Sequence, residues 1–311
     1  VYKRQGSGYS EFPTEINIDN EFVTLLGYYI SEGCITKDKS FRIRFSFNIK
    51  EDEYIKEVEN ILKKIGISYS EYIQNNVLHI KVSSKAFRDI FQFLGTGVNS
   101  YDAKVPSFIL YSKVLQRAVL RGIINGDGSV LLYEGKHYTR KNNRIYSTNR
   151  ISSDVELATA SNKLVQQLFL ILQNIGIVPS YKKSGKVHIL RIFGPENLEK
   201  LKGIIGGEKE KSLNYYLQNL KKRERNSSFK HMDGFSLVKI KEITPVKHDN
   251  YVYSFEVDNT NTIITTSGLI IHNCIPVYPW FIINLAKRPT RLIRTAREIN
   301  DSMPEHMVEL T

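Results

Sequence analysis

The sequence carries one short pattern twice. The first copy reads LLGYYISEG from Leu25 to Gly33, and the second reads LRGIINGDG from Leu120 to Gly128. Each copy places an acidic residue, Glu32 or Asp127, directly before its last glycine. An internal repeat of this kind predicts two copies of one structural unit.

Similar segments follow each copy of the pattern. After the first we expect a strand at 41–48, a helix at 54–64, Ile-Gly-Ile at 65–67, a strand at 78–80 around His79 and a helix at 84–93. After the second we expect a strand at 155–160, a helix at 162–174, Ile-Gly-Ile at 175–177, a strand at 187–189 around His188 and a helix at 195–205. The second copy is longer, and the basic stretch 136–150 supplies the extra residues. The sequence therefore predicts a duplicated α+β fold.

The segment 41–48 alternates between apolar and polar residues. Phenylalanine and isoleucine occupy positions 41, 43, 45 and 47, while Arg42, Arg44, Ser46 and Asn48 lie between them. This pattern is typical of a strand that buries one face and offers the other to solvent or to a ligand. A net charge of +12 favours a polyanionic ligand such as nucleic acid over an ordinary solvated face. A membrane protein would need a long apolar run or a basic amphipathic helix, and we find neither.

The glycines of the repeated pattern have a physical use. Gly27 and Gly122 would let two helices approach closely, and the last glycine of each pattern would end its helix in a conformation that suits a residue without Cβ. Glu32 and Asp127 would then lie side by side and repel each other. A divalent cation such as Mg²⁺ would relieve that repulsion and could assist phosphodiester hydrolysis. The alternative is a pair of ordinary helix ends.

These residues resemble the single-chain LAGLIDADG homing endonucleases over roughly residues 18–230, with repeats at about 18–100 and 101–220. The resemblance implies two saddle-shaped sheets over double-stranded DNA, with Glu32 and Asp127 as catalytic acids that bind Mg²⁺. It implies that Lys104, in Lys-Val-Pro, tunes the attacking water, although it could be a plain surface lysine. Lys211 is a weaker counterpart in the second repeat because no proline follows it. The expected DNA contacts are Arg42, Arg44, Lys136, Arg140, Lys141, Arg144 and Arg150.

The segment 234–273 changes to short strand-like runs and ends in His272-Asn273, followed by Cys274. It resembles the C-terminal part of the Hint-type splicing domain of inteins. The resemblance implies that Asn273 cyclises, that His272 assists by proton donation and that Cys274 acts as a nucleophile. A buried hairpin with a core cysteine is the alternative. Ser254 and Asn261 depart from the usual pattern. Residues 1–17, which we expect to be a linker or remnant, lack the N-terminal splicing motifs. We expect those motifs upstream of Val1, together with the flanking host sequence.

The last segment, 274–311, resembles part of a nucleotide-sugar dehydrogenase acting on UDP-N-acetylmannosamine or UDP-glucose. The resemblance rests on Cys274-Ile-Pro-Val and on the run from Glu298 to Pro304. The glycine-rich segment that would hold NAD is absent, so NAD is expected only for the complete host enzyme.

Taken together, these patterns predict an intein fragment with DNA endonuclease activity. The alternatives are a DNA-binding protein that has lost catalysis and a dehydrogenase activity that belongs to the host protein. Two cysteines, Cys34 and Cys274, cannot form a disulfide framework and favour a reducing, cytoplasmic setting. We expect a monomer that does not associate with membranes.

Overall fold

The computed structural model describes residues 12–36, 42–141, 144–220, 229–232, 235–238, 240, 242–244, 247, 257, 262–265, 268–272, 291–292, 294–296 and 298–299. At 137, 139, 141, 144, 146, 148–150, 229–232 and 272 the description is confined to the backbone. The chain divides into two units, Val1–Lys241 and Glu242–Thr311, and each is described by itself. Both sequence repeats lie in the first unit.

The first repeat consists of a helix, a sheet and two covering helices. Its elements are α1 (Asn20–Glu32), β1 (Gly33–Ile35), β2 (Ile43–Asn48), α2 (Asp52–Ile65), β3 (Ser70–Gln74), β4 (Val77–Val82) and α3 (Lys85–Leu94). The four strands form an antiparallel sheet in the order β1-β2-β4-β3. A short 3-10 helix, η1 (Ser107–Tyr111), leads to the second repeat.

The second repeat follows the same plan. Its elements are α4 (Lys113–Gly126), β5 (Ser129–Lys141), β6 (Arg144–Thr159), α5 (Asn162–Asn174), β7 (Ser180–Ser184), β8 (Val187–Phe193), α6 (Pro195–Glu199) and α7 (Gly207–Gln218). The sheet order β5-β6-β8-β7 reproduces that of the first sheet, element for element. The predicted duplication and the α+β class are therefore confirmed.

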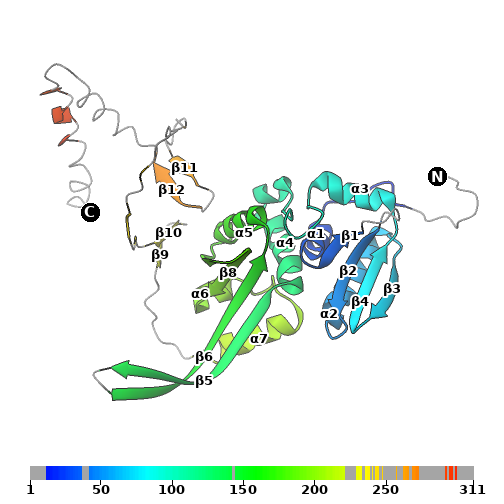
Figure 1. Ribbon diagram of the computed structural model, residues 1–311, viewed down its shortest axis with the longest axis horizontal. Coiled ribbons are helices and arrows are strands. Elements are labelled where there is room, and N and C mark those ends of the chain that lie inside the picture. The colour runs from blue at the N-terminus through cyan, green and yellow to red at the C-terminus, as the bar shows by residue number, and fades with distance from the viewer. Residues whose placement is uncertain are drawn as a thin grey trace, which may run out of the picture. The chain divides into compact units, whose positions relative to one another are not determined.

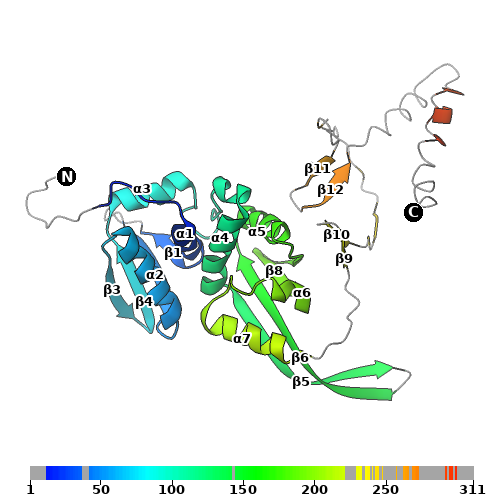
Figure 2. The same cartoon turned by 180° about the vertical axis from the view of Figure 1, so that it is seen from behind.

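Helices α1 and α4 pack against each other between the two sheets (Figure 1), and the view from behind shows the same arrangement (Figure 2). Their backbones touch at the glycines: a Cβ on Gly27 would lie 2.4 Å from the carbonyl oxygen of Val119 and 2.9 Å from the Cα of Gly122. Thr24 adds a hydrogen bond across the contact, donating from Oγ1 to the carbonyl of Ala118 at 3.2 Å. A side chain at either glycine would force the two helix backbones apart.

The core lies between each sheet and its helices. Helix α1 begins where the Asp19 carboxylate accepts a hydrogen bond from the Phe22 amide at 2.9 Å, which caps the helix. Ile43, Phe45 and Phe47 are no more than 1% exposed, which confirms the predicted alternation of β2. Burial of each such side chain stabilises the fold by about 1.5–3 kcal/mol.

The second glycines differ from expectation. Gly33 has φ −95° and ψ 149°, an extended conformation that any residue can adopt. A Cβ there would lie 2.4 Å from the carbonyl oxygen of Tyr29, and one on Gly128 would lie 2.5 Å from that of Ile124. These positions exclude side chains because the chain leaves each helix directly into a strand and passes close to the last turn.

The two histidine-centred strands also differ from each other. His79 pairs with Ser46 on the sheet face that carries Arg44, whereas His188 pairs with Thr159 on the buried face of its sheet and is 6% exposed. The predicted correspondence of His79 with His188 was therefore wrong by one residue. A shift of one residue along a strand moves a side chain to the other face of the sheet.

Two further elements are longer or shorter than expected. Strand β6 starts at Arg144 rather than at 155, because the basic stretch 136–150 forms the outer part of the β5–β6 ribbon. The expected helix at 195–205 is reduced to α6, and hydrogen-bonded turns follow it.

The described strands beyond residue 220 form two hairpins. Strands β9 (Phe229–Met232) and β10 (Phe235–Val238) pair in the first unit, and β11 (Thr262–Ile264) and β12 (Ile270–His272) pair in the second. The turn between β11 and β12 contains Gly268 at φ 73°, a left-handed conformation that favours glycine. Across the described residues, no helix has the length and apolar character needed to cross a membrane. The predicted host segment, 274–311, lies outside the described residues apart from a few between 291 and 299.

Candidate functional site

The two acidic residues of the repeated patterns lie at matching helix ends. Glu32 is the last residue of α1, and Asp127 caps the end of α4 with its N–H bonded to the Ile123 carbonyl at 3.1 Å. A Cβ built on Gly126 would lie 3.0 Å from Cγ of Glu32, so Glu32 packs against the residue that precedes Asp127. The structure thus brings the two carboxylates together where each helix passes into the first strand of its sheet.

This position disfavours negative charge on both carboxylates. Burial raises the pKa of Glu32 to about 8, and the neighbouring charges of Asp127 and Glu51 act in the same direction. Asp127 is exposed, but the surrounding protein still desolvates its carboxylate and, together with Glu51, raises its pKa, while Lys209 opposes that rise. Glu51 was not predicted as part of the site. Two partly desolvated carboxylates form a place where a cation binds favourably.

Lys209 lies beside both carboxylates. Its Nζ donates hydrogen bonds to the carbonyls of Ile124 at 3.0 Å, Asn125 at 2.5 Å and Gly126 at 2.8 Å, the free carbonyls of the last turn of α4. Burial lowers the pKa of Lys209, while Glu51, Glu32 and Asp127 act to raise it. Lys209 is the functional candidate that sequence reasoning missed.

The structure does not bring Lys104 to the carboxylates. Lys104 is exposed, its N–H bonds to the Thr96 carbonyl at 3.1 Å, and it contributes to the pKa of neither acid. Lys211 instead forms ion pairs with Glu208 at 2.6 Å and Glu53 at 3.3 Å. Residues 208–211 alternate between glutamate and lysine. Lys209 and Lys211 are two positions apart, so on a helix their side chains point about 200° apart. Only the orientation of α7 decides which of them reaches the carboxylates.

The open face of the first sheet carries cationic and hydrogen-bonding side chains. Arg44 and Lys81 are opposite each other on β2 and β4, and hydrogen bonds to Tyr72 and Cys34 help raise the pKa of Arg44. Lys81 Nζ lies 5.9 Å from the centre of the Tyr72 ring. Arg42 directly precedes β2 and is half-buried. This face suits phosphate and base-edge contacts.

The second sheet distributes its charges differently. Near its base, Arg191 is paired with Asp154 and lies 3.5 Å from Glu156. The β5–β6 ladder continues outward to the Lys141↔Arg144 pair, so that the ribbon projects from the rest of the repeat (Figure 1). Of the predicted DNA contacts on this ribbon, Lys136 and Arg140 are exposed, and Lys141, Arg144 and Arg150 are described only by their backbones.

Residues 19–94 and 115–206, more than half of the chain, match the protein family described as LAGLIDADG-like domain. The chain belongs to this family. An uncharacterized protein of Methanocaldococcus jannaschii is 35% identical over 278 residues, which cover 85% of this chain and 29% of that protein. A DNA polymerase of Pyrococcus horikoshii is 24% identical over 262 residues, or 84% of this chain and 16% of the polymerase. The chain thus spans less than a third of these two relatives.

Among solved structures, I-DmoI in complex with DNA and Mn is similar to part of the chain. The two sequences are 14% identical, and the match covers 62% of this chain and 99% of I-DmoI, with a TM-score of 0.44. The splicing candidates lie beyond this family match: His272 is the last residue of β12 and pairs with Thr262, and Asn273 and Cys274 lie outside the described residues.

Proposed function

We propose that this chain is a divalent-metal-dependent endonuclease that cuts double-stranded DNA at a specific site. The observation that carries the proposal is the meeting of Glu32 and Asp127 at the ends of α1 and α4, between two sheets. The cationic face around Arg44 and the basic β5–β6 ribbon supply a surface for a duplex.

The donor set at the carboxylates fits Mg²⁺. The described residues contain no group of three or more His, Cys, Asp or Glu side chains that could enclose a metal. Mg²⁺ does not need such a cage, because it binds through one or two carboxylates and completes its shell with water and phosphate oxygens. Glu32 and Asp127 would hold it, and it would polarise the phosphate and lower the pKa of water.

The protein's own groups prepare the site in two ways. The raised pKa of both carboxyls, caused mainly by burial and by neighbouring carboxylates, means that each binds a cation more favourably than an isolated surface carboxylate would. Lys209 adds a fixed positive charge beside them, held by the carbonyls of α4. We assign Lys209 the stabilisation of negative charge that builds up on the phosphate during attack. Lys104 remains the competing candidate from the sequence.

The proposal predicts which residues contact DNA. Arg42 and Arg44 would contact phosphates from the first sheet, and Lys136, Arg140, Lys141, Arg144 and Arg150 would do so from the ribbon of the second sheet. Lys81, which faces Arg44, joins this set. Such contacts hold the duplex in register and make the affinity dependent on salt.

Cleavage of a plasmid tests this function. The plasmid carries the host gene without the segment that encodes this chain, and the reaction is started with Mg²⁺. We expect one double-strand cut at the junction, no cutting in EDTA, and no cutting by Asp127→Asn despite nearly unchanged DNA affinity in Ca²⁺. Binding without cutting by the wild-type protein would favour the alternative of a DNA-binding protein that has lost catalysis. Loss of DNA binding together with cutting in Asp127→Asn would contradict the metal role.

We also propose C-terminal splicing chemistry at Asn273. The supporting observation is the β11–β12 hairpin, which ends at His272 directly before Asn273. The occurrence of a similar segment within a much longer DNA polymerase also supports an inserted element. The side-chain amide nitrogen of Asn273 would attack its own backbone carbonyl, closing a succinimide and releasing the amine of Cys274. Mass spectrometry should detect release of residues 274–311, and Asn273→Ala should prevent it; equal release from both proteins would exclude this chemistry.

A further inference from the structure

The position of Lys209 depends on the segment 204–207, which leads into α7. Helix α7 starts at Gly207. Its N-cap residue, Gly206, has no side chain that could cap the first turn by a hydrogen bond. Lys209 lies in that first turn, so a small shift of the segment would move Nζ away from the carboxylates. The contacts that hold the segment therefore also determine where the lysine lies.

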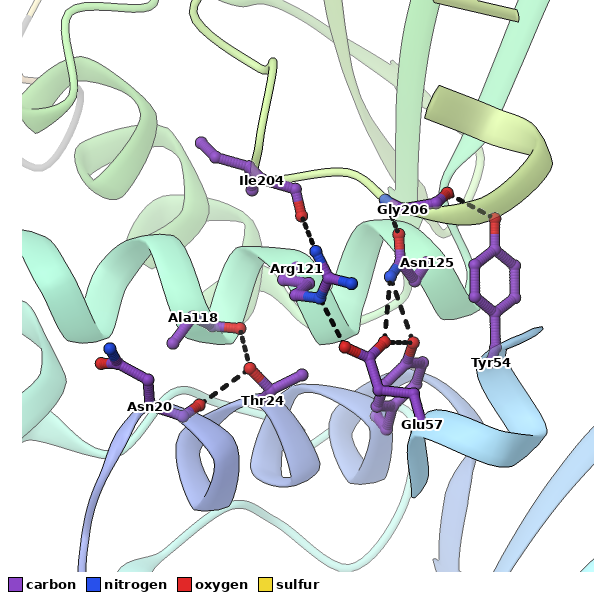
Figure 3. A network of polar contacts seen from close by, with 10 residues as sticks. Asn20, Thr24, Tyr54, Glu57, Ala118, Arg121, Asn125, Ile204 and Gly206 are labelled. Atoms are coloured by element: carbon purple, nitrogen blue, oxygen red, sulfur yellow. Dashed lines mark hydrogen bonds and ion pairs between the residues drawn. The ribbon is translucent and has the colours of Figure 1, made fainter. Parts of the chain in front are cut away.

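Side chains from outside α7 hold this segment (Figure 3). The Tyr54 hydroxyl donates to the Gly206 carbonyl at 3.0 Å, and the Gly206 N–H donates to Oδ1 of Asn125, also at 3.0 Å. Arg121 donates from Nη1 to the Ile204 carbonyl at 3.5 Å. A Cβ on Gly206 would lie only 2.9 Å from Nη2 of Arg121, so the segment fits closely against these groups.

Tyr54 touches both the segment and the lysine. It belongs to α2 in the first repeat, whereas Gly206 and Lys209 belong to the second. Its side chain is 5% exposed, and Nζ of Lys209 lies 5.2 Å from the centre of its ring. An aromatic face at this distance attracts an ammonium group. The hydroxyl and the ring of Tyr54 thus fix the start of α7 and the charge that α7 carries.

Glu57, one turn after Tyr54 on α2, orients the remaining partners (Figure 3). Its carboxylate accepts hydrogen bonds from Nε of Arg121 at 2.5 Å, from the Tyr28 hydroxyl at 2.5 Å and from Nδ2 of Asn125 at 3.4 Å. Asn125 also donates to the Tyr28 oxygen at 3.1 Å. The fully buried Asn125 therefore has its amide oriented so that its oxygen faces Gly206.

The first repeated pattern lacks an equivalent of Asn125. Asn125 occupies the third position after Gly122 in the second repeated pattern, and the first pattern has Ile30 at that position, which cannot accept a hydrogen bond. Together these contacts lead to one assignment. We propose that Tyr54 is a positioning residue, which holds Lys209 of the opposite repeat against Glu32 and Asp127 through Gly206 and through its ring. The inference rests on the proposed endonuclease function.

A double-mutant cycle tests the assignment. Tyr54→Phe removes the hydrogen bond to Gly206 and keeps the ring. Its single-turnover cutting rate should fall about tenfold with unchanged DNA affinity in Ca²⁺. In a Lys209→Met background the same change should have almost no further effect, because the group that it positions is already absent. A purely structural role would reduce the rate equally in both backgrounds, and that result would overturn the proposal.

The control is Tyr69→Phe. Nζ of Lys63, near the end of α2, lies 5.8 Å from the centre of the Tyr69 ring. This pair makes the same kind of lysine–tyrosine contact as Lys209 and Tyr54, but away from the carboxylates. Tyr69→Phe removes only the hydroxyl and keeps the ring, as Tyr54→Phe does, and it should leave the cutting rate unchanged. A loss of rate comparable with that of Tyr54→Phe would count against a specific role for Tyr54.

A second readout does not depend on cutting. Lys209 is half-buried, so it should react slowly with an amine-directed ester, and Tyr54→Leu should increase its labelling severalfold by mass spectrometry, with Lys63 as the internal standard. Unchanged labelling of Lys209 would contradict the assignment. If the wild-type protein binds but cuts no target, the endonuclease proposal fails, and the labelling still decides whether Tyr54 positions Lys209.

Discussion

The two repeats share one sheet order and carry their positive charge in different places. In the first repeat, Arg44 and Lys81 face each other on the open side of a compact sheet. In the second, acidic neighbours neutralise Arg191 near the base of the sheet, and basic residues continue along a projecting ribbon. Duplication thus preserved the fold while the two surfaces diverged, and we expect an asymmetric DNA target.

The centre of the molecule is asymmetric as well. Lys209 of the second repeat reaches the carboxylates, whereas Lys104, the lysine that the sequence predicts for this site, remains exposed. The difference begins with Ile30 and Asn125, which occupy the same position of the repeated pattern. The second repeat therefore supplies more of the proposed catalytic groups than the first.

Removal of Lys209 and of Lys104 should give the largest difference in cutting rate. Lys209→Met should lower the single-turnover cutting rate by about 100-fold or more, because a fixed positive charge next to the phosphate is lost. Lys104→Met should change it by less than about threefold, within the range of a peripheral effect. A larger loss in Lys104→Met than in Lys209→Met would reverse the comparison.

The ribbon should control how far contacts extend on one side of the target. From the Glu134↔Ile151 pair to the Lys141↔Arg144 pair it spans roughly 23 Å, or about seven base pairs. Replacement of residues 136–149 by a two-residue Asn-Gly turn should lower affinity by about 10- to 100-fold, since several cations are removed. Footprinting should show shortened protection on one side only.

A shortened duplex provides the matched control for that variant. Removing about seven base pairs from the ribbon's side of the target should weaken the wild-type protein and leave the shortened variant unaffected. Equal weakening of both proteins would show that the ribbon does not contact this DNA.

Opposite charge changes on the two sheets should shift DNA affinity in opposite directions. Lys81→Gln should weaken binding by about fivefold and reduce the slope of affinity against salt by about one. Asp154→Asn should strengthen binding, because it leaves Arg191 less neutralised and makes the second sheet more like the first. Titrations at several salt concentrations measure both effects, and a parallel change in the two variants would contradict the assigned difference between the sheets.

The smallest expected effect concerns the stability of the metal-free protein. Folding raises the pKa of Glu32 from 4.5 to about 8, so between these values the folded state holds a proton that the unfolded state releases. Stability should therefore fall as pH rises from about 4.5 to about 8. Glu32→Gln does not titrate, and its melting temperature in EDTA should exceed that of the wild type by about 3 °C or more at pH 8. Identical pH profiles of the two proteins would refute this account.

Much of the site could be predicted because it depends on local pattern. The repeated glycines require two helices in close contact, and such a contact brings Glu32 and Asp127 together. The alternation in β2 assigns Arg44 to the open face, since successive side chains of a strand alternate. These inferences need only the periods of helices and strands and the size of glycine.

Other features depended on how elements pack and could not be read from local pattern. Both Lys209 and Lys211 suit the first turns of α7, and only the rotation of that helix against α4 selects Lys209. The faces of His79 and His188 depend on strand register, which pairing across the sheet decides. The sequence alone determined the duplicated fold and its two acids, because glycine spacing and alternation act over a few residues. The tertiary structure decided which lysine joins those acids, because that choice depends on contacts between residues far apart in the chain.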